Sequence, residues 1–171
     1  DVYKRQVECC EDPQFYTLLG EYGKGQLLES KFAPYAGPPF YLSTVDTYVT
    51  DYQAKYNTLP GMMGADTYDA FYIAKAAIEA AGTVDKAAVR DAIKSSSIDQ
   101  MLIITETGKI EFSTGTNYHE IAPVTFIEQL VWNEAAGECR AAIVYPDSAP
   151  GIDPLKQADF ALPEGYEPGS P

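Results

Sequence analysis

Small and apolar residues recur at the spacing of an α-helix along residues 65–93, ADTYDAFYIAKAAIEAAGTVDKAAVRDAI. On a helical wheel, one half of the first part of this segment collects alanine, isoleucine and phenylalanine. Asp69, Tyr68 and Tyr72 fall on the other half, together with the charged side chains. Because alanine lets a neighbouring backbone approach closely, we expect the alanine half to pack against a sheet. The tyrosines are then expected to cover the surface as half-buried amphipathic residues.

Capping and helix-breaking residues predict the ends of this helix. Asp66 or Thr67 is expected to cap its start, and Gly82 is expected to end it. Thr83 is then predicted to cap a second helix, with Asp85 in its first turn. The pattern therefore predicts a helix, a glycine break and a second helix.

A further helix is predicted upstream, at residues 43–57, where valine and tyrosine recur at helical spacing and Ser43 or Thr44 supplies the cap. The preceding FAPYAGPPFYL, residues 32–42, contains three prolines that forbid regular structure, so we interpret it as a crossing or hinge segment. TLPGMMG, residues 58–64, is predicted to be a loop between the helices.

The period changes from 3.6 to 2 after residue 98. Residues 108–114, GKIEFST, alternate apolar and charged positions as a strand does. Residues 122–146 predict two strands around a loop near Asn133–Gly137, which is a β-hairpin, and the tail 147–171 is expected to wrap the surface. Helices followed by antiparallel strands predict an α/β fold with a terminal antiparallel element.

Composition narrows the range of functions. The 171 residues are enough for one domain with a hydrophobic core, and no apolar run approaches the roughly 20 residues of a membrane span. The formal net charge of −13 repels phosphate backbones and anionic lipid headgroups. We therefore expect no nucleic-acid partner and no membrane-surface binding.

The start of the chain differs in character from the rest. Residues 1–6, DVYKRQ, resemble a leader found at the start of unrelated assembled environmental reading frames, and the chain has no initiator methionine. We interpret them as a non-native leader and expect the chain to be a fragment that lacks its own N-terminus. Of the adjacent Cys9 and Cys10, one could reach Cys139 in a disulfide and leave the other free.

The sequence contains no catalytic or metal-binding signature. In GEYGKG, residues 20–25, the lysine is followed by glycine rather than serine or threonine, so a turn is predicted instead of a phosphate-binding loop. His119 is the only histidine, which excludes a multi-histidine metal site, and no G-x-S-x-G elbow accompanies it. The acidic pair Asp66 and Asp69 has a simpler role near a helix start, where carboxylates complement the helix dipole. No cofactor is expected.

Four segments carry a family likeness, and they occur in the family's order. GADTYDAFYIAKAAIEAAGTVDKAAVRDAI resembles the YDA helix of type I periplasmic substrate-binding proteins of ABC transporters, in particular the branched-chain amino acid type. FYTLLGEYGKGQLLESKFAPY, GKIEFSTGTNYHEIAP and VTFIEQLVWNEAAGECRAAIVYP resemble the segments before and after it. The hairpin loop NEAAG is longer than is usual in the family.

The resemblance implies two α/β lobes with a ligand cleft between them, of which this chain supplies the C-terminal portion, with a terminal antiparallel hairpin. The implied division is residues 7–32 in lobe two, 33–104 in the helical part of lobe one, 105–146 in strands returning to lobe two, and 147–171 in the tail. The chain would cross between the lobes near residues 32–40 and return near 104–108.

The resemblance also implies a function. Such proteins are monomers in the periplasm, or outside the cell and membrane-associated, and they pass a small polar solute such as an amino acid to an ABC permease without catalysis. Glu8 falls where an acidic residue of the amino-acid binders pairs with the ligand's ammonium group. Tyr68 and, more weakly, Tyr72 are expected at the cleft side. Two alternatives stay open: a ligand-sensing receptor domain of the same fold, and a hydrolase that uses His119.

Overall fold

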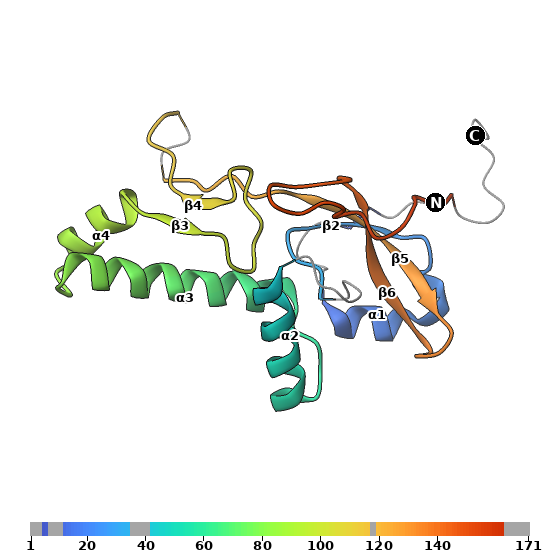
Figure 1. Ribbon diagram of the computed structural model, residues 1–171. Helices are drawn as coiled ribbons and strands as arrows, with labels where there is room; N and C mark the ends of the chain where they lie inside the picture. The colour runs from blue at the N-terminus through green and yellow to red at the C-terminus, as the bar shows by residue number, and fades with distance from the viewer. Residues whose placement is uncertain (1–4, 7–11, 35–41, 117–118, 163–171) are drawn as a thin grey trace.

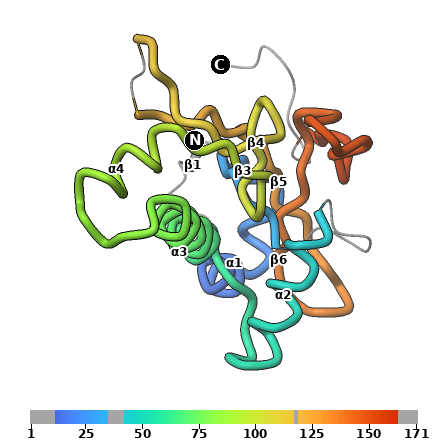
Figure 2. Tube along the Cα trace, turned by 60° about the vertical axis from the view of Figure 1, so that its left-hand side comes forward, coloured from blue at the N-terminus to red at the C-terminus, as the bar shows by residue number. Residues whose placement is uncertain are grey.

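The computed structural model describes residues 5–6, 12–34, 42–116 and 119–162, which form two bodies side by side (Figure 1). The elements in chain order are β1 (Arg5–Gln6), α1 (Pro13–Leu19), the 3-10 turn η2 (Gly20–Gly23), β2 (Leu27–Ser30), α2 (Ser43–Tyr56), α3 (Met62–Ala81), α4 (Lys86–Lys94), β3 (Ser97–Asp99), β4 (Lys109–Glu111), β5 (Phe126–Asn133) and β6 (Glu138–Tyr145). We call α2, α3, α4 and the β3–β4 pair the helical half, and α1, η2 and the remaining strands the sheet half. Figure 2 also places α3 and α4 on the side away from the β5–β6 hairpin.

The sheet half is built on four strands in the order β1-β2-β5-β6. β1 is parallel to β2, whereas β5 is antiparallel to both of its neighbours, β2 and β6. The predicted hairpin is confirmed, because Asn133 pairs with Glu138 across a turn in which Gly137 has a φ of 66°. The glycine-rich segment at 20–25 is a turn, as predicted. β2 was not predicted.

Helix α1 covers one face of this sheet. Its start is fixed by Asp12, whose carboxylate accepts a hydrogen bond from the Gln14 backbone N–H at 2.7 Å. Tyr16 then packs in a core with Leu28, Leu130 and Cys139. The Cys139 thiol is buried, which raises its pKa, and it donates to the Gly20 carbonyl at 3.2 Å. Cys9 and Cys10, the other cysteines, lie outside the described residues.

The helical half has its own core, in which α2 and α3 pack against the segments that follow β2 and α4. Its fully buried side chains include Phe32, Val45, Met62 and Leu102. A third core joins the two halves. Its buried members are Ala33, Ile104, Phe126, Ile143, Ile152 and Leu155.

The sequence predicts that the C-terminal tail only wraps the surface. In the structure, the described part of the tail contributes to a core. Ile152 and Leu155 are buried in the core that joins the halves. Further along, the Gln129 side-chain amide donates to the Ala161 carbonyl at 2.8 Å and its oxygen accepts from the Ala161 N–H at 2.9 Å. The described tail is therefore part of the folded body. The assignment of the residue ranges to lobes stays a prediction.

Helix α3 begins earlier than predicted. Gly61, in extended conformation, precedes its first residue, Met62, so Asp66 and Thr67 lie inside the helix rather than at its cap. Pro60 limits how early the helix can begin, because proline is tolerated at the start of a helix but disrupts its interior. Gly82 ends the helix as predicted, with a φ of 64° that favours glycine.

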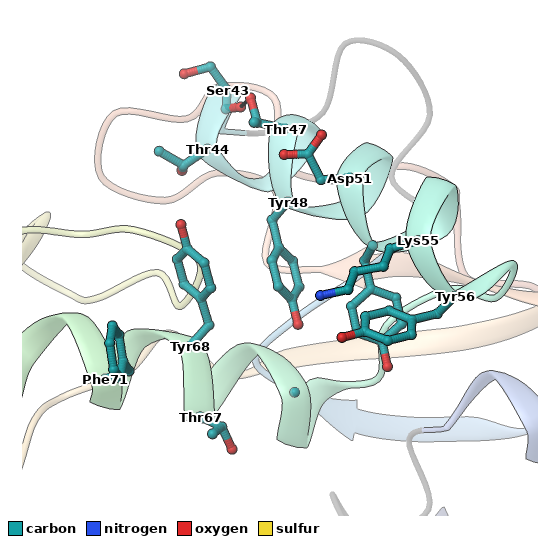
Figure 3. A pocket seen from close by; sticks show the side chains of 12 residues that line it. Ser43, Thr44, Thr47, Tyr48, Asp51, Lys55, Tyr56, Thr67, Tyr68 and Phe71 are labelled. Carbon is teal, nitrogen blue, oxygen red and sulfur yellow. Dashed lines mark hydrogen bonds between the residues drawn. The ribbon is translucent and has the colours of Figure 1, made fainter.

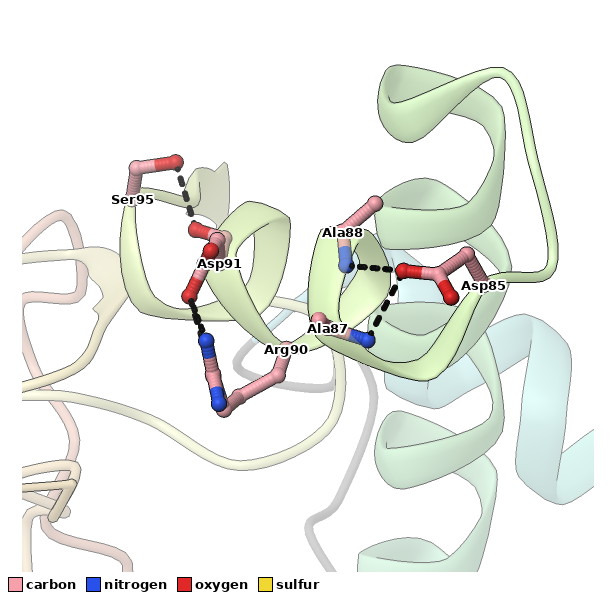
Figure 4. Close-up of polar contacts among 6 residues, drawn as sticks. All are labelled: Asp85, Ala87, Ala88, Arg90, Asp91 and Ser95. Atoms are coloured by element: carbon pink, nitrogen blue, oxygen red, sulfur yellow. Dashed lines mark hydrogen bonds and ion pairs between the residues drawn. The ribbon is translucent and has the colours of Figure 1, made fainter.

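The caps of the other two helices also differ from the prediction. Leu42, which has no capping side chain, precedes α2, and Thr44 instead donates its hydroxyl to the Met101 carbonyl at 2.5 Å. Asp85 rather than Thr83 caps α4, where one carboxylate oxygen accepts from the N–H groups of Ala87 and Ala88 at 3.1 and 3.0 Å (Figure 4). Asp85 is favoured over Thr83 as the cap of α4, because its charged carboxylate oxygen interacts with the positive end of the helix dipole.

The buried side of α3 is rotated from the predicted one. Asp69, predicted on the exposed half, is only 4% exposed, whereas Phe71 and Ile78 of the apolar half are 65% and 41% exposed. The alanine side borders an apolar cavity of about 410 Å³ that α3 shares with α4 and β4. The two-stranded sheet β3–β4 reaches this cavity through Ile110 of β4, and packing of the alanine half against the larger sheet of a lobe stays a prediction.

The Asp69 carboxylate ties α3 to the chain that follows β3. It accepts from the Ile103 N–H at 2.9 Å and from the Leu102 N–H, which lies 3.2 Å from each oxygen. Burial raises its pKa from 3.8 to about 6, although these hydrogen bonds lower it in part. Asp69 is thus a structural latch, not a complement of the helix dipole.

The latch predicts a pH dependence of stability. The folded state binds the Asp69 proton more tightly than the unfolded state does. The stability gained from this protonation is therefore fully present below about pH 4 and is lost as the pH rises through about 6. We expect the free energy of unfolding to fall by about 2 kcal/mol between pH 4 and 7 on this account. Urea unfolding of the native chain and of Asp69→Asn, which has no proton to lose, measures the difference. A difference that does not vary with pH would contradict the prediction.

Candidate functional site

A polar notch lies where the two halves meet. It has a volume of about 240 Å³, and Figure 1 shows α1 beside the end of α2 at this place. Its walls come from α1, from the end of α2 with the loop after it, and from β6. The lining residues are Pro13, Gln14, Thr17, Gln53, Asn57, Thr58, Leu59, Glu138 and Arg140. We call it the interbody notch.

The notch has one charge of each sign on its sheet-half wall. Glu138 and Arg140 lie two positions apart on β6, where the alternation of a strand puts both side chains on one face. The Arg140 Nε lies 3.5 Å from a Glu138 carboxylate oxygen, and the Thr17 hydroxyl donates to the other oxygen at 3.5 Å. Gln53 and Asn57 supply amides on the opposite wall. This set can bind a small molecule that carries both a carboxylate and an ammonium group.

A larger hollow lies within the helical half, between α2 and α3 (Figure 3). Its volume is about 620 Å³, within the range of small-molecule sites. Aromatic rings from both helices and several polar side chains of α2 form its walls. The lining residues are Ser43, Thr44, Thr47, Tyr48, Asp51, Tyr52, Lys55, Tyr56, Gly64, Thr67, Tyr68 and Phe71. We call it the tyrosine groove.

Five tyrosines form a continuous series of ring contacts along this groove. Tyr56 contacts Tyr52 at 4.6 Å between ring centroids, Tyr52 contacts Tyr48 at 5.9 Å, and Tyr48 crosses to Tyr68 of α3 at 5.0 Å. Tyr68 then contacts Tyr72 at 4.6 Å. The series follows from helical spacing, because residues four apart on one helix lie on the same face.

The two central hydroxyl groups stay protonated at neutral pH. Burial raises the pKa of Tyr48 to about 12, and electrostatic repulsion from the phenol group of Tyr52, the Asp69 carboxylate and the phenol group of Tyr56 adds to this. Burial likewise raises the pKa of Tyr68 to about 12, with a further contribution from Tyr72. Both phenols are therefore neutral groups that can donate a hydrogen bond.

The residues predicted from sequence are not brought together at the notch. Glu8 lies outside the described residues. Tyr68 lines the tyrosine groove, and Tyr72 packs on Tyr68 but is not among the residues that line the groove. The sequence analysis missed Glu138 and Arg140. Their alternation along a predicted strand places them on one face, but nothing local shows that α1 and the end of α2 meet them.

His119 lies exposed in the loop after β4, with a φ of 70°, and its backbone N–H donates to the Ser113 carbonyl at 2.9 Å. Across residues 12–34, 42–116 and 119–162 no group of three or more histidine, cysteine, aspartate or glutamate side chains is placed to hold a metal ion. None of the helices in this part of the chain is long and apolar enough to cross a membrane.

Comparison with known proteins gives a family match. A family model described as "Periplasmic binding protein" matches residues 17–129, about two thirds of the chain. Searching the curated proteins gives no match.

Solved structures share the fold. A leucine binding protein LivK from Thermotoga maritima is 22% identical, with a TM-score of 0.57 over 85% of this chain and 38% of that one. A putative branched-chain amino acid ABC transporter from Silicibacter pomeroyi is 17% identical, with a TM-score of 0.61 over 94% and 40%. A solute binding protein of an ABC transporter from R. palustris, solved with benzoate, is 14% identical, with a TM-score of 0.55 over 84% and 35%.

These likenesses confirm the predicted fold class, an α/β chain that matches part of the type I fold and ends in an antiparallel hairpin. The chain spans 35% to 40% of the length of these three structures.

Proposed function

Because the chain belongs to the periplasmic binding protein family, we propose that it is part of an extracytoplasmic solute-binding component of an ABC importer. In this role it binds a small polar solute such as an amino acid between its two halves and passes it to a membrane permease. It works outside the cytoplasmic membrane, as a monomer, and does not transform the solute. The family match over residues 17–129 is the observation that carries the proposal.

The interbody notch is our proposed contact site for the solute. It is lined from both halves, so a molecule bound there contacts both and favours their closed arrangement. A solute carboxylate would pair with Arg140, and an ammonium group with Glu138. Leucine and benzoate, named for two of the similar structures, both carry a carboxylate. Glu8 stays a proposed second partner of the ammonium group.

Leucine tests the proposal by isothermal titration calorimetry of the 171-residue chain. We expect saturable binding that Arg140→Gln weakens about 10-fold, because removal of one charge-assisted pair costs on the order of 1.5 kcal/mol. Arg90→Gln is the matched control, since Arg90 lies exposed on α4 and pairs with Asp91. Equal affinity of both variants would contradict the placement at the notch. No saturable binding of leucine or other amino acids would contradict amino-acid binding itself, and turnover that His119→Ala abolishes would favour a hydrolase.

A further inference from the structure

We propose that the tyrosine groove is a second binding site, which takes a monocarboxylate with a planar aromatic ring. Tyr48 and Tyr68 would hold the ring, and Lys55 would bind the carboxylate. The inference goes beyond the proposed function, because the groove lies wholly between α2 and α3 and shares no residue with the interbody notch.

Aromatic residues are left open around the groove to an unusual extent. Phe71 is 65% exposed, Tyr56 54% and Tyr72 39%, although all three join or adjoin one series of rings. Single exposed apolar residues are ordinary, whereas a contiguous group around a hollow of about 620 Å³ marks a binding surface. A planar ring fits this surface, because aromatic pairs gain from offset or edge contacts beyond their buried area.

The groove also has a positive end. Figure 3 shows the Lys55 ammonium group directed into the space between the helices, near the Tyr48 hydroxyl. Asp51 also lines the groove, and the picture places its carboxylate farther from the Tyr48 hydroxyl than the Lys55 ammonium group. The Lys55 Nζ lies 5.2 Å from the centroid of the Tyr56 ring. An anion placed here meets an ammonium group and a neutral hydroxyl donor.

Charge limits the anion to a single carboxylate. The whole chain has a formal net charge of −13, which opposes the approach of nucleotides and other polyanions. The single negative charge of a monocarboxylate matches the single positive charge of Lys55. A cationic ligand is disfavoured, because the Lys55 ammonium group already occupies the place where a cation would contact the ring of Tyr56.

Gly64 keeps the groove open where the two helices approach. A Cβ atom added at Gly64 would lie 3.0 Å from the Tyr48 hydroxyl oxygen, so alanine at this position requires that hydroxyl to shift by a few tenths of an ångström. The glycine therefore sets the position of a proposed ligand contact.

Three small probes of similar size test the inference by calorimetry and by ligand-observed NMR on the 171-residue chain. Phenylacetate is the expected ligand. Cyclohexylacetate keeps its charge without the aromatic ring, and phenylacetamide keeps the ring without the charge. We expect phenylacetate to bind about fivefold more tightly than either analogue, since ring contacts and the ion pair each contribute on the order of 1 kcal/mol.

Three variants locate the site, each with a matched control. We expect Tyr68→Ala, Lys55→Gln and Gly64→Ala each to weaken phenylacetate binding at least about fivefold. The controls Tyr22→Ala, Lys86→Gln and Gly115→Ala change exposed residues outside the groove and should leave binding unchanged. Circular dichroism spectra identify any variant that has lost its fold, and Tyr68→Phe then tests the groove with the ring retained.

The outcomes separate this inference from the proposed function. Loss of phenylacetate binding in the groove variants, with leucine binding unchanged, supports a second site. Phenylacetate affinity that falls with Arg140→Gln instead would place the aromatic acid in the notch and overturn the inference. Equal affinity for all three probes, or no binding of phenylacetate, would overturn it as well, regardless of whether the chain binds leucine.

Discussion

Replacing Asp69 with alanine is expected to lower the free energy of unfolding by about 3 kcal/mol at pH 7. The carboxylate accepts hydrogen bonds from the backbone N–H groups of Leu102 and Ile103, and Leu102 is fully buried. Truncation to alanine leaves both donors without their acceptor, and each buried donor left in this way costs about 1 to 3 kcal/mol. Removing the cost of burying the charge offsets only part of the loss.

Urea unfolding followed by circular dichroism measures this change, with Asp91→Ala as the control. Asp91 lies exposed on α4, where it pairs with Arg90 (Figure 4), so its removal should cost about 0.5 kcal/mol or less. Two variants of equal stability would show that Asp69 does not hold the segment after β3. Amide hydrogen exchange at Leu102 and Ile103 should also accelerate in Asp69→Ala alone.

Asp69 also shows where a helical wheel fails as a predictor. Periodicity located α3 and α4 and Gly82 ended α3 as predicted, because these depend on residues that are neighbours in sequence. The wheel placed Asp69 on the exposed half, since a carboxylate is normally solvated. The Asp69 carboxylate is buried because it accepts a hydrogen bond from the backbone N–H of Leu102, which is 33 residues away in the sequence.

The helix starts show a second limit of local patterns. Ser43, Thr44 and Thr83 are good capping residues by type, yet Leu42 and Asp85 occupy the positions before α2 and α4. Thr44 is taken by a contact with Met101, far along the chain. A cap is therefore decided by competition between local and distant acceptors, which one segment alone does not reveal.

The candidate site was predictable only in part for the same reason. The tyrosine spacing on α2 and α3 indicates that each helix has an aromatic face, and Tyr68 does lie on a groove wall. Tyr48 meets Tyr68 across the two helices, and Gly64 lies beside the Tyr48 hydroxyl there, which the spacing within either helix does not reveal. The interbody notch depends on three segments that are distant in sequence, so neither Glu138 nor Arg140 stood out.

Replacement of Phe32 with alanine is expected to have the largest effect of all, a loss of about 4 kcal/mol in the free energy of unfolding. Phe32 is completely buried, and the Ser30 hydroxyl holds its backbone by accepting from its N–H at 3.1 Å and donating to its carbonyl at 2.8 Å. Its ring packs in the core of the helical half and meets the edge of Tyr48 at 6.1 Å between centroids. Truncation removes the apolar contacts and leaves a cavity in a segment that leads out of the sheet half.

The same substitution connects the core to the tyrosine groove. Without the Phe32 ring, Tyr48 loses one of its supports, so we expect Phe32→Ala to weaken phenylacetate binding as well as stability, while Phe32→Leu costs only about 1 to 2 kcal/mol. Phe160→Ala is the control, because that ring is 48% exposed. Urea unfolding gives the stability and calorimetry below the transition gives the affinity. A loss under about 1 kcal/mol in Phe32→Ala would contradict its place in the core, and unchanged affinity in a folded variant would show that Tyr48 keeps its position without it.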